Sequence, residues 1–172
     1  SADFNSIVTI TAAAGDTLSF SKASGTQSLK AHPTQNLPVI VHSGAGTLSL
    51  ATNAVKTLGF VQTDGTLDLN GKNVTTVSAG NFTISNGKTT SLAGLNDRKI
   101  TVAGNASFTG SVIDSIYLMS ANPCTLAVTG TLSAQYAVIK NNKATGSSGN
   151  AYTSTDSTGN YRDALHNYLA ES

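Results

Sequence analysis

Charged residues are scarce in this sequence of 172 residues, and their scarcity argues against several classes of function. Lys, Arg, Asp and Glu make up 11% of the chain and leave a formal net charge of +1, whereas about a quarter of an average protein is charged. The Lys residues occur singly and form no basic stripe, so nothing points to a nucleic-acid partner. The sequence also lacks any run of 18 apolar residues, so it predicts no transmembrane segment.

Cysteine and tryptophan are almost absent as well. The chain has one cysteine, Cys124, and no Trp. A lone cysteine offers neither a disulfide framework nor a thiolate metal site, and we expect Cys124 to be a small buried hydrophobic residue. The chain begins at Ser1 without Met, which suggests a processed protein or an excised piece. Few cysteines and few charges favour a secreted, cell-surface protein.

Hydroxyl side chains take the place of charges as the polar surface. The sequence contains 24 Thr and 21 Ser, and Thr favours the pleated, half-buried surface of a strand over a helix. The apolar residues are regularly spaced and the net charge is small, which argues against disorder. The composition therefore predicts an all-β protein.

One short phrase returns along the chain: a Gly, a small polar residue, and then alternating apolar positions. Its copies are Gly15–Phe20, Gly46–Leu50, Gly65–Leu69, Gly80–Ile84, Gly104–Phe108 and Gly130–Ser133. From Gly46 to Gly130 the four intervals are 19, 15, 24 and 26 residues, with a mean of 21. A repeat of this length is typical of one coil of a β-solenoid.

We therefore predict a single-chain, right-handed parallel β-helix (β-solenoid) of about six to seven coils over residues 1–160. In such a stack the alternating apolar residues point inward and form one column: Leu48, Leu50, Leu67, Leu69, Phe82 and Ile84. Two longer intervals hold predicted excursions, Asn86–Asp97 and Ser111–Pro123, the second with an extra strand. A β-sandwich is the alternative, because it also gives short alternating strands at regular spacing.

The end of the chain changes character. Leu165 and Leu169 lie four residues apart beside Tyr161 and Tyr168, which gives one apolar helical face. Since solenoids must close their ends, residues 161–172 are predicted to form a short amphipathic capping helix or a subunit-contact segment.

Two stretches carry a resemblance to a known group of proteins. The repeated texture of Gly46–Ile84 and the stretch Ser133–Gly146 resemble the β-helical repeat regions of large secreted bacterial surface proteins and adhesins. Such regions usually end in a Gly-Asn-Asn stretch with Trp, and here Thr158–Tyr161 stands in its place. The resemblance implies a β-helix fold with an adhesive or structural role, and it brings no shared catalytic residues.

The sequence contains no convincing set of catalytic residues. Asp64 and Asp68 are the closest pair of carboxylates by sequence, and glycoside hydrolysis needs two facing carboxylates. Asp68, however, should point outward between two inward leucines, and Asp64 precedes a turn glycine, where Asp is common. The charged cluster Asn96–Lys99 is best explained as a solvated turn before a strand.

No metal or cofactor site is predicted either. His32, His42 and His166 are widely separated in the sequence, and no phosphate loop or nucleophile motif occurs. The five tyrosines all lie in the C-terminal third, where they could bind sugars, contact a subunit or belong to the cap: Tyr117, Tyr136, Tyr152, Tyr161 and Tyr168. We predict no catalytic, metal-binding or cofactor-binding residues.

The predicted function is therefore that of an extracellular structural or adhesive module, and not of an enzyme. A solenoid end exposes unpaired backbone groups that another copy can satisfy, which favours a homo-oligomer, a filament or a surface-layer subunit. The short lead-in before Ile7 offers little to cap the N-terminal end. The alternatives are a polysaccharide-binding or polysaccharide-degrading β-helix, with surface glycans as partners, and a viral fibre or spike.

Overall fold

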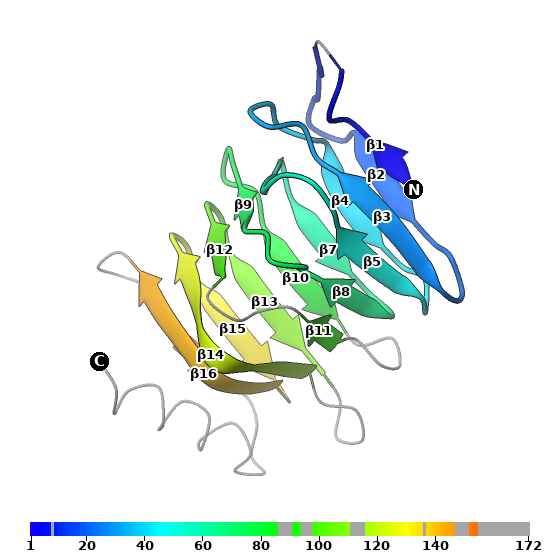
Figure 1. Cartoon of the computed structure of the whole chain (residues 1–172). Coiled ribbons are helices and arrows are strands. Elements are labelled where there is room, and N and C mark those ends of the chain that lie inside the picture. Colours follow the sequence, from blue (N-terminus) through cyan, green and yellow to red (C-terminus); the bar gives the residue numbers. More distant parts are fainter. Residues whose placement is uncertain are drawn as a thin grey trace.

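The computed structural model describes residues 1–7, 9–85, 91–93, 98–110, 116–135, 137–146 and 152–154. These residues form 17 strands (Figure 1), and no helix occurs among them. The predicted capping helix, residues 161–172, lies outside the described residues. Within the described ranges, no helix is long and apolar enough to cross a membrane.

One sheet, which we call face B, contains seven parallel strands. They stack in chain order from the N-terminal end of the molecule to the C-terminal end (Figure 1). The strands are β2 (Thr17–Phe20), β4 (Val39–His42), β7 (Phe60–Gln62), β10 (Phe82–Ser85), β13 (Ala106–Thr109), β15 (Leu132–Gln135) and β17 (Tyr152–Ser154).

The ten-stranded second sheet supplies the other two sides of the solenoid. Face A consists of β1 (Ala2–Asp3), β3 (Thr26–Lys30), β5 (Thr47–Leu50), β8 (Thr66–Asp68) and β11 (Ser91–Ala93). Face C consists of β6 (Val55–Thr57), β9 (Val74–Thr76) and β12 (Lys99–Val102). The long strand β14 (Ile116–Val128) joins them, because its first part pairs with β11 and its last part with β12. Strand β16 (Ala137–Gly146) pairs along β14.

Every strand pairing is parallel and joins one turn to the next. On face B the paired residues are 22, 20, 22 and 24 positions apart: Leu18 with Ile40, Ile40 with Phe60, Phe60 with Phe82, and Phe82 with Ala106. This arrangement confirms the predicted β-solenoid and excludes the β-sandwich, whose sheets are antiparallel. The predicted right-handedness stays a prediction.

About four turns, from β4 to the end of β14, carry a strand on all three faces, and β15 with β16 adds a further one because β16 pairs with both parts of β14. The sequence predicted six to seven coils. The difference lies at the two ends of the stack. There β2 and β17 extend face B, although the described residues do not complete the turns to which these strands belong. In the first turn, face C is reduced to a single parallel bridge between Leu37 and Thr57.

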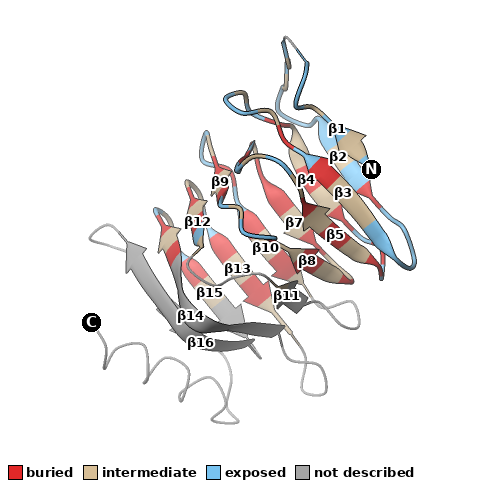
Figure 2. Ribbon diagram, viewed as in Figure 1, coloured by how far each residue is buried: buried red, intermediate tan, exposed pale blue. Residues whose placement is uncertain are grey.

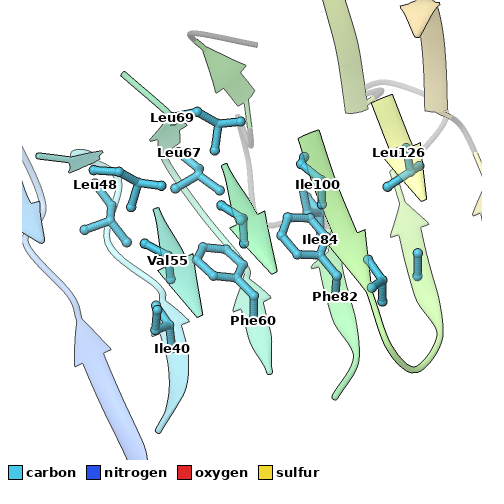
Figure 3. Close-up of a cluster of buried hydrophobic side chains, with 14 of the residues drawn as sticks. Ile40, Leu48, Val55, Phe60, Leu67, Leu69, Phe82, Ile84, Ile100 and Leu126 are labelled. Atoms are coloured by element: carbon cyan, nitrogen blue, oxygen red, sulfur yellow. The ribbon is translucent and has the colours of Figure 1, made fainter. Parts of the chain in front are cut away.

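The core is a column of apolar side chains along the axis of the solenoid (Figure 3), and buried residues recur along the strands of successive turns (Figure 2). The six residues predicted to point inward are all at most 1% exposed: Leu48, Leu50, Leu67, Leu69, Phe82 and Ile84. Three aromatic rings follow one another along face B. The ring centroids are 5.1 Å apart between Phe60 and Phe82, which are stacked, and 6.2 Å apart between Phe82 and Phe108. The predicted inward alternation is therefore confirmed.

The repeated glycine phrase proves to mark two different corners of the solenoid. Gly46 and Gly65 precede face A strands, whereas Gly80, Gly104 and Gly130 precede face B strands. The 15-residue interval from Gly65 to Gly80 therefore crosses from one corner to another and is less than a turn. Intervals between glycines of the same corner, 19, 24 and 26 residues, are the true turn lengths.

The apolar stretch within Ser111–Pro123 is not an extra strand. Residues Ile116–Met119 form the ordinary face A strand of their turn, where they pair in register with Ala137–Lys140 of β16. The irregularity lies after Met119, where the register with β16 shifts before Cys124. The side chain of Cys124 lies outside the described part of the structure, so its predicted burial stays a prediction.

Candidate functional site

The two carboxylates closest in sequence are both used in local turn structure. Asp64 follows β7, and its Oδ1 accepts a hydrogen bond from the Gly65 amide at 2.8 Å. Asp68 lies on the outer side of β8, where Oδ1 accepts from the Asn70 amide at 2.9 Å and Oδ2 accepts from the Ser49 hydroxyl at 3.4 Å. These contacts explain both residues as turn and surface residues.

The charged residues at the start of β12 contribute to a corner of the solenoid. The Arg98 guanidinium donates to the Gly71 carbonyl at 2.9 Å, and the Lys99 amide donates to Asn73 Oδ1 at 2.9 Å. Both contacts join this turn to the preceding one. Asn96 and Asp97 lie outside the described residues.

The histidines are found in two different environments. His32 shapes a loop, because its Nδ1 accepts hydrogen bonds from the amides of Thr34 at 3.1 Å and Gln35 at 2.9 Å. His42 is fully buried at the end of β4. His166 is outside the described residues. Among the residues that the structure describes, no group of His, Cys, Asp and Glu could hold a metal ion.

A set of buried polar residues was not predicted from the sequence. His42, Thr57, Gln62 and Thr76 are each at most 1% exposed. The hydroxyl of Thr76 donates to the Gly80 carbonyl at 2.6 Å and accepts from the Ala103 amide at 3.0 Å, which ties two turns together. Only the position of these residues in the sequence could have indicated their burial, because each occupies an inward place in the period-two pattern of its strand.

The feature of the described chain most suited to binding is the open edge of β2. It is the end strand of face B. The β4 amides of Val39 and Ser43 donate to the carbonyls of Asp16 and Phe20, at 3.1 and 2.9 Å. Because backbone groups alternate in direction along a strand, the N–H and C=O groups of Thr17 and Ser19 point away from β4.

The side chains around this edge leave it accessible. Thr17 and Ser19 are exposed, and Leu18 is only half-buried beside the buried Phe20. A Cβ placed on Gly15, just before the strand, would meet nothing within 4 Å. The edge is therefore open at its N-terminal start as well as along its outer side.

The residues before Ile7 extend face A but leave β2 at the edge of face B. Ala2 and Asp3 pair with Leu29 and Lys30, so two residues of β1 extend face A by one strand. Asp3 forms an ion pair with Lys30 at 2.9 Å. Hydrogen bonds from Lys30 and from the Asn5 amide lower the pKa of the Asp3 carboxyl. Both side chains are about half exposed, so the ion pair holds β1 only weakly.

The chain between β1 and β2 packs loosely over the end of the core. Phe4 and Ile10 are partly buried against it, whereas Ile7 is 38% exposed. The Phe4 amide donates to the Lys30 carbonyl at 2.8 Å, and the Ile10 amide donates to Gln35 Oε1. The predicted lack of a full N-terminal cap is thus correct for face B, and wrong for face A, where β1 adds a short strand.

The chain matches no known family model, no curated protein and no solved structure. The resemblance to bacterial surface proteins is therefore supported at the level of fold alone.

Proposed function

We propose that this chain is an extracellular structural or adhesive module that self-associates end to end through its N-terminal edge. The supporting observation is β2, an accessible terminal strand on a seven-stranded parallel sheet. Parallel edges pair readily with another strand, and natural proteins normally cover, shorten or charge them. The two outward side chains of β2, Thr17 and Ser19, carry no charge that would repel a strand.

A second copy suits this edge better than an unrelated strand does. The opposite end of the same sheet is β17, the last strand of face B among the described residues. Docking β17 of one copy on β2 of the next would continue a parallel sheet in the same direction. Such a contact joins two different surfaces and repeats without closing, which produces a filament.

A proline scan of the edge tests this proposal. In Ser19→Pro the lost N–H is one that points away from β4, so the fold keeps its own pairing while the edge loses a donor. We expect the native chain to show concentration-dependent growth in sedimentation velocity, Ser19→Pro to remain much smaller, and the matched control Ser19→Thr to behave as the native chain. A native chain that stays monomeric at high concentration across pH and salt would refute the proposal.

A second candidate is glycan binding on the outer side of face A. Thr26, Thr47 and Thr66 follow one another in register on β3, β5 and β8, with Ser28 and Ser49 beside them. This hydroxyl array offers hydrogen-bond donors and acceptors at the strand spacing of about 4.8 Å. A glycan array would support this function if binding were lost in Thr47→Val and kept in the opposite-face control Thr83→Val.

A further inference from the structure

His42 occupies a place in the core where a charge cannot be accommodated. It is the last residue of β4, is 0% exposed, and stacks in register between Phe20 of β2 and Gln62 of β7. Neither Nδ1 nor Nε2 has a hydrogen-bond partner among the described residues. A neutral imidazole has one donor and one acceptor to satisfy, and its protonated form has two donors and a full charge.

The residues around His42 offer little to stabilise its protonated form. The neighbouring strands present Phe20 and Gln62, and the Gln62 Nε2 donates to the Gly65 carbonyl at 2.7 Å. Asp64 is the one ionisable group of the described chain whose charge acts on the imidazole. Burial lowers the pKa of His42, and this effect exceeds the opposing influence of Asp64.

The cover over His42 is the terminal turn of the described stack and has a complete turn on one side only. Strands β1–β3 and the residue after β3 bury three hydrophobic residues, namely Phe20, Leu29 and Ala31, and Leu37 ends the first turn at its bridge to Thr57. The next turn, β4–β6, buries four hydrophobic residues and lies between two other turns: Ile40, Leu48, Leu50 and Val55. Since hydrophobic stabilisation grows with the apolar area buried, opening the first turn is the least costly way to bring water to His42.

We propose that His42 makes the N-terminal turn, β1–β3, a cover that acid releases from β4 and β5. Release would hydrate the imidazolium and expose a second edge, flanked by Ile40, Leu48 and Leu50. Its strand β4 has four residues, like β2, but is more apolar, and β5 adds four more, so this edge would bind a second copy more strongly. The role of the released edge in assembly rests on the proposed self-association, whereas the release itself does not.

The direction of the pH effect follows from the two states of the turn. In the open state His42 binds a proton near its ordinary pKa of 6.5, and in the closed state its pKa is lower. The cover is therefore fully stable above about pH 6.5 and loses stability as the pH falls below it. The open population rises by up to about tenfold per pH unit until the pKa of the closed state is reached.

Hydrogen exchange of the whole chain from about pH 7 to about pH 5 tests the release. Four amides report on it because they donate across the cover: Val39 to Asp16, Ser43 to Phe20, Thr47 to Gly25, and Ala51 to Leu29. After correction for the intrinsic pH dependence of exchange, we expect their protection to fall by up to about tenfold per pH unit. The Phe60 and Phe82 amides, which donate to Asn81 and Asn105, should keep theirs.

Three variants assign the effect to His42. His42→Phe and His42→Gln each remove the titrating group, one with an aromatic ring like Phe20 and one with an amide like Gln62, and either should abolish the extra loss of protection. His32→Gln, at the loop histidine, should retain it. The proposal is overturned if the native reporter amides follow the control amides, or if the loss persists in a folded His42 variant.

Sedimentation at the same pH values separates this inference from the proposed function. Larger assemblies at about pH 5 than at about pH 7, absent in the His42 variants, would support both. Loss of protection without any assembly would retain the acid release and overturn the self-association.

Discussion

At the residue scale, two glycines with the same backbone conformation have different roles. Gly65 and Gly71 have φ values of 72° and 73°. Gly71 follows Asn70, whose φ is also positive at 44°, and the Lys72 amide donates to the Leu69 carbonyl at 2.8 Å. This geometry is a β-turn with two left-handed central residues, for which Asn-Gly is favoured. Space around Gly71 is open, whereas a Cβ on Gly65 would lie 2.3 Å from the carbonyl oxygens of both Gly44 and Gly46.

The pair gives a matched test of what the stacked turns require. We expect Gly71→Ala to lower the free energy of unfolding by about 1–2 kcal/mol, because only the left-handed backbone is strained. Gly65→Ala should cost about 1–3 kcal/mol more, since its methyl group would push two turns apart. Urea denaturation measures both values. Equal losses in the two variants would contradict the close approach of turns at Gly65.

The buried polar residues show why the sequence did not predict part of the core. Thr57 looks like a surface residue by type, yet its hydroxyl lies within hydrogen-bond distance of the carbonyls of Pro38 and Gly59, the second at 2.9 Å, and donates its one proton to this pair. Hydrogen bonding to a corner makes its burial favourable. The identity of such a partner depends on which corners stack, which the sequence does not reveal.

At the element scale, asparagine side chains tie corners of successive turns together. Asn81 Oδ1 accepts from the Asn105 amide, and Asn105 Oδ1 accepts from the Thr131 amide, each at 2.9 Å. The second contact leaves no room for a side chain at Gly130, where a Cβ would lie 2.3 Å from Asn105 Oδ1. The glycine that precedes a face B strand and the asparagine of the turn below are therefore one unit.

Removing one asparagine tests this unit. Asn105→Ala should lower the free energy of unfolding by about 1 kcal/mol, the usual contribution of one hydrogen bond. The Thr131 amide should lose protection from hydrogen exchange more than the neighbouring amides do. Asn105→Asp keeps an acceptor oxygen in place and serves as the control. Unchanged protection of Thr131 in Asn105→Ala would contradict the role of the side chain.

The strands and corners differ in how far the sequence predicts them. Strand alternation is local, so the inward leucines of β5 and β8 follow from the period of two alone. The assignment of corners is not local. Gly65 and Gly80 begin similar phrases but precede different faces, and only the pairing of Thr66 with Thr47 and of Phe82 with Phe60 separates them. The mean interval of 21 residues therefore combines one part of a turn, Gly65 to Gly80, with three full turns.

At the scale of the whole molecule, the proposed self-association depends on how a stack of turns ends. Each turn satisfies its backbone groups through the turns above and below, so an end without a cover is unsatisfied. The described N-terminal end has a two-residue strand on face A, a single bridge on face C and the open strand β2 on face B. The short lead-in before Ile7 predicted the open β2 edge. The sequence did not predict strand β1 or the ion pair between Asp3 and Lys30.

Electron microscopy of the native particle tests end-to-end self-association most directly. Continuous stacking predicts unbranched filaments with an axial repeat of about 34 Å, since seven face B strands lie about 4.8 Å apart. Ser19→Pro should give separate short particles under the same conditions, and Ser19→Thr should give filaments. Single particles of the native chain at high concentration, or assemblies joined side by side with no repeat along the solenoid axis, would contradict the account.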